Sequence, residues 1–345
     1  MRALGAVLAL ACWNAAAAPG VKVGVFGLFR PQRLTVKPAP GHVVRLEAGG
    51  EAMELEAGLT AGLRREGASV DCFARRRLVT APAVRVAARD GGPGEFVLGV
   101  PGRVERRFRG VLHVRAEAAA LLAVIEVGLE TAVASAVAAE LPAGTPLEAL
   151  AAQAIVARSY YTVGRGRHGS YDFCDTTHCQ FLREPPQDGS AYEKAVRLTR
   201  GMVLVYGDQV VAGLYSAACG GRTRAAAETG MTAGRYPYFS VPCGHCLRHA
   251  REWESRLSPA DGAALLARPG SEALRLEIVR RLGWGTLPGN NYLVVREDGR
   301  IVFRGRGAGH GVGLCQEGAA AMARGGASCR DILAHYYPAA TVEVR

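Results

Sequence analysis

The sequence predicts an α+β fold, in which helices and antiparallel strands are mixed without a repeating β-α-β order. Short β-prone pieces separated by glycine and proline occupy the first third, while helix-start signals and a two-residue turn between apolar strands follow in the second half. The chain has 345 residues, of which 49% are hydrophobic and 21% are charged. This length and composition suit a folded protein and exclude a disordered, collagen-like or coiled-coil chain.

The chain starts with a short apolar segment, residues 3–13, which follows Arg2 and precedes small residues up to Ala18. This pattern predicts a secretory signal peptide over residues 1–18 and an exported protein. The segment is shorter than the roughly 20 apolar residues that span a bilayer, and the later sequence predicts no transmembrane segment. The alternative is a lipoprotein acylated at Cys12, although Ala stands three residues before it, where Leu is usual.

Residues 19–107 predict a β-rich N-terminal region, and residues 108–345 a second domain that contains the helix signals. The β-prone pieces of the first region are residues 21–26, 33–36, 42–46 and 84–86. Lys and Arg exceed Asp and Glu by 42 to 31, a net charge of +11 that favours an anionic partner or polymer. Aromatic residues are not interleaved with the basic runs, so we do not expect nucleic-acid binding.

The first helix signal is Thr145-Pro146-Leu147-Glu148. It predicts a capping box, with Thr145 as N-cap, Pro146 at the first helical position and Glu148 returning to the cap. The predicted helix covers residues 146–163 and ends at Gly164.

The same capping chemistry appears twice more. Ser190 and Glu193 predict the start of a helix that ends at Gly201, and Ser328 and Asp331 predict the start of a helix over residues 332–337.

A β-hairpin is predicted between these helices, with strands at residues 202–206 and 209–214 around the turn Gly207-Asp208.

Two histidines and two cysteines fall within twelve residues, at His168, Cys174, His178 and Cys179. Such a set can close a tetrahedral zinc site with two nitrogen and two sulfur ligands. Four protein ligands leave no open position for water, so the metal would hold the loop and a zinc hydrolase is disfavoured. A Cys174–Cys179 disulfide is the alternative, but it leaves both histidines without a role.

Glu140 is an acid in the apolar stretch Val137-Ala-Ala-Glu-Leu-Pro142. A carboxyl among apolar neighbours tends to have a raised pKa, as a general acid near neutral pH requires. The residues alone leave a second interpretation open, because a glutamate at a helix end before proline is usually exposed.

Two glycine-rich stretches, residues 215–223 and 305–319, can bring the backbone close to a ligand. The second contains His310 and predicts a helix beginning near Val312. It matches neither the phosphate-loop nor the dinucleotide-binding pattern, because it lacks Gly-Lys-Ser/Thr and a third glycine in a β-α-β context.

Six motifs in this order resemble the SpoIID/LytB family, which includes stage II sporulation protein D and proteins named amidase enhancers. The resemblance covers about residues 21–338, nearly the whole mature chain. The motifs are Glu140-Leu-Pro, the helix from Leu147 to Tyr160, Cys174-Asp-Thr-Thr-His178-Cys179-Gln180, Tyr215-Ser216-Ala-Ala-Cys-Gly220-Gly221-Arg-Thr223, Gly309-His310-Gly311-Val-Gly313-Leu-Cys-Gln316-Glu-Gly318-Ala319 and Ile332-Leu-Ala-His-Tyr-Tyr337-Pro338.

The resemblance implies a peptidoglycan lytic transglycosylase that cleaves MurNAc–GlcNAc bonds and leaves 1,6-anhydro-MurNAc ends, with residues 108–345 as the catalytic domain. Glu140 stands where the family has its catalytic acid. The same comparison implies a structural zinc on His168, Cys174, His178 and Cys179. It also implies a glycan cleft lined by Ser216, Gly220, His310 and Gln316.

The amidase-enhancer name raises an alternative function, a non-catalytic peptidoglycan-binding activator of another cell-wall hydrolase. Two departures from the family pattern favour it, because both remove surface on which a sugar can stack. The segment Glu130-Thr-Ala-Val133 lacks the family's aromatic residue, and Ala308 replaces a common Trp.

The second half contains three further cysteines that could form a disulfide or bind a metal, Cys219, Cys243 and Cys246. Export favours a disulfide between Cys219 and one of the other two, which is our preferred interpretation. A second metal site is the alternative, since Cys243-Gly-His-Cys246 resembles half of a zinc knuckle.

Overall fold

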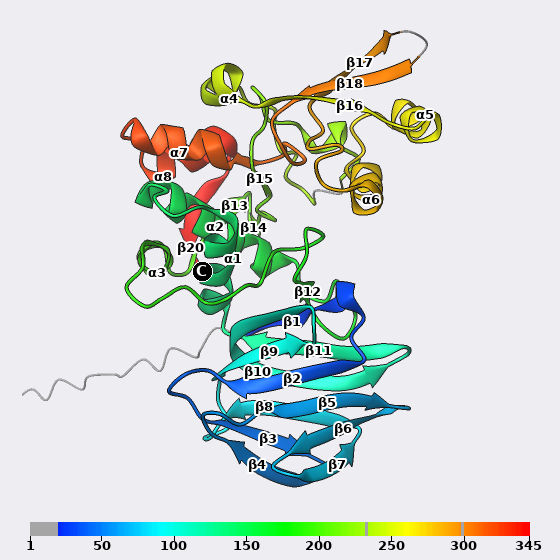
Figure 1. The fold of residues 1–345 in the computed structure, drawn as a ribbon. Coiled ribbons are helices and arrows are strands. Elements are labelled where there is room, and N and C mark those ends of the chain that lie inside the picture. The colour runs from blue at the N-terminus through cyan, green and yellow to red at the C-terminus, as the bar shows by residue number, and fades with distance from the viewer. Residues whose placement is uncertain (1–19, 232–233, 298–299) are drawn as a thin grey trace, which may run out of the picture.

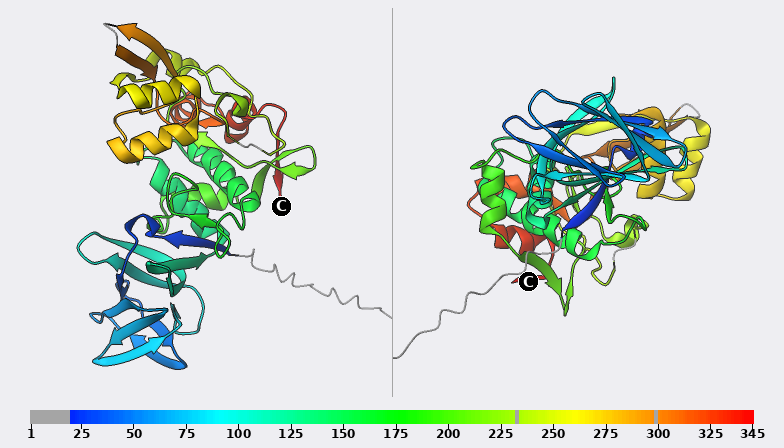
Figure 2. Two further views of the ribbon diagram at one scale, coloured as in Figure 1. Left: turned by 90° about the vertical axis from the view of Figure 1, so that its right-hand side faces the viewer. Right: turned by 90° about the horizontal axis from the view of Figure 1, so that it is seen from below.

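The protein is described by a computed structural model that covers residues 20–231, 234–297 and 300–345 (Figure 1). Helices and mostly antiparallel strands are mixed, which confirms the predicted α+β class. Figure 2 shows an elongated molecule, with the β-rich region at one end, a smaller group of strands and helices at the other, and the main helices between them.

The predicted signal peptide over residues 1–18 and the alternative lipid site Cys12 lie outside the described residues. Within the described ranges, no helix is both long enough and apolar enough to cross a bilayer.

The N-terminal region is a branched, mainly antiparallel sheet. Its central strand bends so that residues 104–110 pair with one neighbour and residues 111–117 with two others. The strands are β1 (Val21–Val25), β2 (Arg33–Pro38), β3 (Val44–Ala48), β4 (Glu51–Leu55), β5 (Ala61–Glu66), β6 (Ser69–Ala74), β7 (Arg77–Ala81), β8 (Ala83–Ala88), β9 (Gly94–Val100), β10 (Val104–Glu117), β11 (Ala120–Val127) and β12 (Phe173–Cys174). The four predicted β-prone pieces fall in β1, β2, β3 and β8.

The alternation of buried and exposed residues explains this sheet. In β2 and β3, for example, every second side chain is buried, as expected for strands with one face on a core. Strands β10 and β11 continue beyond residue 107 to Val127. The domain boundary at that residue stays a prediction.

The middle of the molecule is a helical layer built around one alanine-rich helix. Residues 149–161 of α2 are all buried, because small side chains allow other helices to pack on every side. The elements of this layer are α1 (Leu129–Glu140), α2 (Leu147–Val163), α3 (Ala191–Leu198), β13 (Met202–Tyr206), β14 (Gln209–Val210), β15 (Tyr215–Ser216), η2 (Ala226–Glu228), α4 (Gly244–His249), β19 (Leu314–Cys315), α7 (Gln316–Arg324), α8 (Cys329–Tyr336) and β20 (Thr341–Val344). The short helix η1 (Gly27–Phe29) lies between β1 and β2 of the N-terminal region.

A buried ion pair ties α1 to α2. The guanidinium of Arg158 is 1% exposed and binds the Glu130 carboxylate in a bidentate manner, with N–O distances of 2.9 and 2.7 Å. The same guanidinium donates to the carbonyl oxygens of Met202 and Val196. These contacts join α1, α2, α3 and β13 around the Arg158 guanidinium. Glu140 is the last residue of α1.

Two of the three predicted caps are confirmed. The Ser190 hydroxyl accepts the Glu193 amide, although α3 ends at Leu198, before the predicted Gly201. The Ser328–Asp331 capping box is complete. The predicted hairpin also forms, since β13 pairs with β14 across Gly207-Asp208.

The capping box predicted at Thr145 is wrong. Pro146 itself is the N-cap of α2, and the Thr145 hydroxyl donates to the Pro142 carbonyl at 2.7 Å. The Glu148 carboxylate accepts the Cys329 amide, which belongs to α8. Glu148 therefore bonds to the first turn of α8 and not to the start of its own helix.

The helix predicted to begin near Val312 begins four residues later, at Gln316. The intervening residues form β19, which pairs in parallel with β15 through Tyr215↔Leu314 and Ser216↔Cys315. Positive φ angles at Gly309, Gly311 and Gly313 let the backbone turn tightly before this strand.

Residues 252–306 form an additional small layer that the sequence analysis does not predict. It has a three-stranded antiparallel sheet in the order β16-β18-β17 and two helices, with a core of its own that includes Leu265, Ile278 and Phe303. The elements are β16 (Glu252–Arg256), α5 (Pro259–Ala267), α6 (Glu272–Leu282), β17 (Tyr292–Glu297) and β18 (Arg300–Arg306).

Candidate functional site

Glu140 lies in the wall of a cavity of about 250 Å³. Ser216, His310 and Gln316, which the sequence analysis also selects, line the same cavity. The complete lining is Glu140, Tyr160, Thr177, Cys179, Gln180, Phe181, Gly213, Leu214, Tyr215, Ser216, Ala217, Glu272, Arg275, Trp284, Pro288, Gly309, His310 and Gln316. The end of α1, the loop after β12, the β15–β19 pair and the additional layer therefore meet here.

The Glu140 carboxyl is largely removed from water. Burial raises its pKa above the ordinary value of 4.5, while the Tyr215 hydroxyl and the charge of Arg183 oppose part of this rise. The Tyr215 hydroxyl donates to Glu140 Oε1 at 3.3 Å. A carboxyl held in this way can keep a proton closer to neutral pH than an exposed glutamate, as a general acid must.

The Tyr215 hydroxyl lies between the Glu140 carboxyl and the Gln180 side chain. The Tyr215 hydroxyl lies 3.4 Å from Gln180 Oε1, and Gln180 donates through Nε2 to the Ala157 carbonyl at 3.2 Å. The single tyrosine proton serves either Glu140 or Gln180, so this pair can adjust when Glu140 gains or loses a proton.

A second cavity, of about 290 Å³, also has Glu140 in its wall. Glu140, Ala217 and Gln316 line both cavities, so the two cavities adjoin at these residues. We call the two adjoining cavities the groove. This arrangement suits a polymer that passes across the carboxyl with units bound on both sides.

Two buried polar atoms in the groove wall have no hydrogen-bond partner among the described residues. Ser216 is 4% exposed and Gln316 is 8% exposed, yet Ser216 Oγ and Gln316 Nε2 make no hydrogen bond among the described residues. A buried polar atom left without a partner costs about 1–3 kcal/mol. A hydroxyl-rich ligand in the groove would satisfy both atoms.

His310 has a structural place in the wall. Its Nδ1 accepts the Val312 amide at 3.0 Å, so the other ring nitrogen carries the proton. Burial lowers the pKa of His310, whereas Glu272 and the backbone of Tyr215 raise it and Arg275 lowers it. The neutral imidazole therefore contacts the backbone of both glycine-rich stretches, at Val312 and Tyr215.

Gly220 does not line either cavity. It has a φ of +78°, and a Cβ there would lie 2.5 Å from the Arg306 carbonyl oxygen. Glycine is needed at this position because two backbone segments approach each other closely.

The additional layer contributes a tryptophan that the sequence analysis did not select. Trp284 lines the cavity and is 51% exposed, so one face of the indole is open to a ligand. Only its aromatic character signals a site in the sequence, because no motif surrounds it. Trp284 is thus a partly exposed aromatic side chain in the wall of this cavity.

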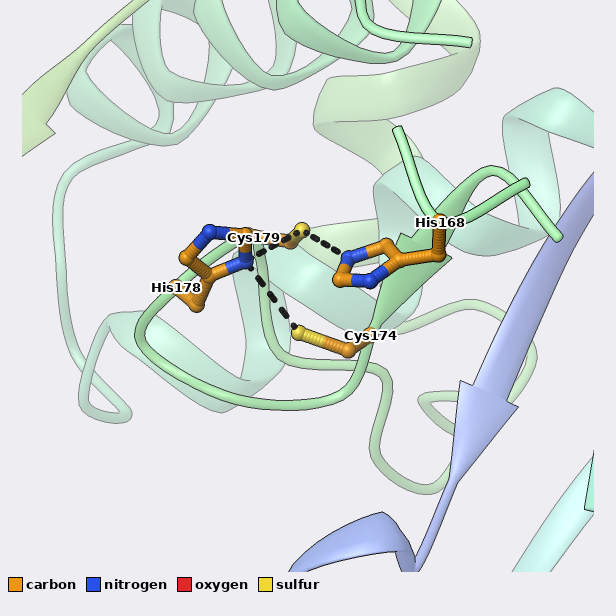
Figure 3. Close-up of side chains that lie close together, drawn as sticks. All are labelled: His168, Cys174, His178 and Cys179. Carbon is orange, nitrogen blue, oxygen red and sulfur yellow. Dashed lines mark hydrogen bonds between the residues drawn. The ribbon is translucent and has the colours of Figure 1, made fainter. Parts of the chain in front are cut away.

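The predicted metal ligands converge into one cluster (Figure 3). His168 Nε2 lies 3.3 Å from Cys179 Sγ, and His178 Nδ1 lies 3.5 Å from Cys179 Sγ and 3.7 Å from Cys174 Sγ. Strand β12 carries Cys174 and pairs with β1, while the ring of His168 stacks on Tyr171.

This cluster fits a tetrahedral metal. Its four donor atoms lie within 4.8 Å of one another, and each can turn toward one centre. A hydrogen bond with Cys179 lowers the pKa of the Cys174 thiol, whereas burial opposes the change. The thiolate form that binds metals is therefore favoured at one sulfur. Cys179 also lines the cavity next to Gln180, so a metal here would hold that wall.

A second group of four sulfurs corrects the predicted disulfide. Cys219, Cys243, Cys246 and Cys315 converge in the core with unbonded sulfurs, and each is at most 2% exposed. Cys315, which the sequence pattern did not associate with the other three, completes the set, and the group can hold a metal ion. His245, between Cys243 and Cys246, lines the second cavity instead.

Comparison with known proteins supports the predicted relationship. Residues 117–206 match the family described as SpoIID, Stage II sporulation protein. This segment contains Glu140 and all four residues of the first metal cluster, while Ser216, His310 and Gln316 lie beyond it.

Two curated relatives are similar over a longer range. A protein of Brachyspira hyodysenteriae described as uncharacterized is 28% identical over 248 residues, covering 63% of this chain and 67% of that protein. The amidase enhancer of Bacillus subtilis is 24% identical over 281 residues, covering 59% of this chain and 39% of the relative. Together with the family match, these similarities confirm the resemblance to the SpoIID/LytB family.

Proposed function

We propose, from the relationship to the SpoIID/LytB family and the associated role at the cell wall, that this protein is an exported peptidoglycan lytic transglycosylase. Its substrate would be the bond from C1 of MurNAc to the O4 oxygen of GlcNAc. The observation that carries this proposal is Glu140, a carboxyl with a raised pKa in the wall of the groove.

In the first half of the reaction, protonated Glu140 donates its proton to the glycosidic O4 oxygen as the C1–O4 bond breaks. Burial keeps the carboxyl protonated at a higher pH than an exposed glutamate. The Tyr215 hydroxyl, 3.3 Å from Oε1, then stabilises the carboxylate that forms.

In the second half, the Glu140 carboxylate accepts the proton of the muramic C6 hydroxyl while O6 bonds to C1. The proton lost from O6 replaces the one given to O4, so Glu140 returns to its starting state and no water is consumed. One carboxyl is enough, in contrast to the two-carboxylate glycosidases, because the nucleophile is the substrate's own hydroxyl.

The groove residues would bind the sugars on both sides of this carboxyl. Ser216 Oγ and Gln316 Nε2, which have no hydrogen-bond partner in the part of the chain that the structure describes, would bond to sugar hydroxyl or N-acetyl groups. Arg324 in the second cavity places a positive charge near an anionic polymer, in keeping with the net charge of +11. His310 would position Tyr215 and Ser216 through its neutral ring.

A zinc ion on His168, Cys174, His178 and Cys179 would have a structural role. It would link the loop before Gln180 to β1 and so fix one wall of the groove. With four protein ligands it has no free position for water.

The test is mass spectrometry of the products that the mature protein releases from purified glycan strands, with and without their stem peptides. Muropeptides with 1,6-anhydro-MurNAc ends, lighter by one water than hydrolysis products, are expected from at least one substrate. Reducing MurNAc ends would instead identify a hydrolase and contradict the proposed reaction.

Trp284→Ala is expected to raise the KM for glycan about 5- to 10-fold, with kcat changed less. The reason is that a sugar stacked on the half-exposed indole buries apolar area worth about 1 kcal/mol. Steady-state kinetics on soluble glycan strands measure the effect, and Trp284→Phe should retain most of the affinity.

Leu293→Ala is the matched control for Trp284. Leu293 is 75% exposed in the same layer, on β17, and does not line either cavity. An equal rise in KM for both variants would show that Trp284 has no special contact with the glycan.

The second candidate function is a peptidoglycan-binding activator of a cell-wall amidase. The relative named amidase enhancer favours it. It predicts that the protein binds glycan without releasing anhydro products and stimulates a purified amidase. Under this function Glu140→Gln would leave the stimulation intact.

A further inference from the structure

The second cysteine group joins three segments that are far apart in sequence. Cys219 follows β15, Cys243 is the N-cap of α4, Cys246 lies within α4, and Cys315 ends β19. Their sulfur atoms all lie within 4.8 Å of one another, and Cys246 Sγ is 3.4 Å from Cys315 Sγ. Four convergent sulfurs are the complete ligand set of a tetrahedral metal site.

The spacing of the sulfurs selects the kind of centre. Zn–S bonds of about 2.3 Å in a tetrahedron put neighbouring sulfurs about 3.8 Å apart. The four sulfurs all lie within 4.8 Å of one another, with one pair at 3.4 Å, which suits a single tetrahedral ion. A disulfide requires about 2.05 Å, and a cluster of several iron atoms requires more space between its cysteines.

Hydrogen-bond donors surround two of the sulfurs. The amides of Cys219 and Gly318 each donate to Cys315 Sγ at 3.4 Å, and the Tyr336 hydroxyl lies 3.4 Å from Cys243 Sγ. Such donors stabilise thiolates more than thiols, and they commonly surround metal-bound sulfur.

The backbone is shaped to allow this approach. A Cβ at Gly318 would lie 2.6 Å from Cys243 Sγ and 2.0 Å from the Tyr336 hydroxyl oxygen. Any larger residue would push α7 away from the sulfurs. In addition, Cys243 and Cys246 have the Cys-x-x-Cys spacing of structural zinc sites.

We propose that Cys219, Cys243, Cys246 and Cys315 bind a structural zinc ion, distinct from the site at His168. The ion would neutralise buried thiolates and tie α4 to the β15–β19 pair. Ser216 lies opposite Cys315 in that pair, and Gln316 follows Cys315. The zinc would therefore stand behind the wall that presents Ser216 and Gln316 to the groove.

Metal content tests this site without depending on any enzymatic activity. The mature protein, purified without chelator, is expected to contain about two zinc ions per chain by elemental mass spectrometry. Cys243→Ala should lose one zinc, and Cys174→Ala should lose the other. Cys72→Ala is the matched control, because Cys72 is buried in the N-terminal region and belongs to neither group.

A second measurement uses the unmodified protein, in case a variant fails to fold. Cobalt(II) in place of zinc should give intense sulfur-to-cobalt charge-transfer absorption that corresponds to more than the two thiolates of the first site. Disulfides among these four cysteines in non-reducing peptide maps would overturn the proposal. A Cys243→Ala protein with the full zinc content would also overturn it.

Discussion

Glu140→Gln is expected to reduce the release of anhydro-muropeptides by about 10²- to 10⁴-fold, the usual contribution of a general acid–base residue. Glutamine has nearly the shape of the glutamate and can still bond to Tyr215, but it cannot give or accept the proton. Binding of glycan should persist, because the other groove residues are unchanged. Product analysis at equal protein concentration measures the loss.

The same substitution is expected to stabilise the protein at neutral pH. Burial raises the folded pKa of Glu140, so above pH 4.5 the unfolded chain ionises this group before the folded protein does, and stability falls until the pH passes the folded pKa. Below the ordinary value of 4.5 the carboxyl is protonated in both states and the difference vanishes. The Tm advantage of Glu140→Gln should therefore grow as the pH rises from 4 to 8.

Glu117→Gln is the control for both measurements. Glu117 is an exposed acid at the end of β10. It pairs with Arg115 and lines neither cavity of the groove. It should leave product release and the pH dependence of Tm unchanged. A Glu140→Gln protein that retains full lytic activity would exclude Glu140 as the acid and favour the activator function.

Arg158→Met is expected to destabilise the protein by about 3–5 kcal/mol, as removal of one partner of a buried ion pair usually does. The guanidinium is 1% exposed, and its loss leaves the Glu130 carboxylate and the carbonyls of Met202 and Val196 without their donor. Methionine keeps most of the volume, so the loss reflects charge and hydrogen bonds. Urea unfolding followed by circular dichroism measures it.

Arg197→Met is the matched control on α3. Arg197 is 62% exposed and pairs with Glu193 one helical turn away. Such exposed pairs contribute about 0.3–0.5 kcal/mol. Similar losses for the two variants would show that the buried pair is not what holds α1 on α2.

Local signals in the sequence correctly predict several elements of the fold. Alternating burial predicts β2 and β3, and the Ser328–Asp331 box forms within one helical turn. The convergence of His168, Cys174, His178 and Cys179 was also predictable, because all four fall within twelve residues of one loop.

The sequence left open the features that depend on contacts between distant segments. The Tyr215 hydroxyl reaches Glu140 across 75 residues of sequence, and Cys219 meets Cys315 across 96. Trp284 reaches the groove only because the additional layer folds back onto the β15–β19 pair. The Thr145 cap failed for the same reason, since Glu148 binds the start of α8.

The sequence by itself therefore determined the α+β class, the family resemblance and the loop that gathers the first metal ligands. Only the tertiary structure decided that Glu140 is buried, that it lines the groove and that four cysteines converge behind the groove wall. The physical reason is range: capping and alternation act within a few residues, whereas burial and ligand convergence depend on how whole elements pack.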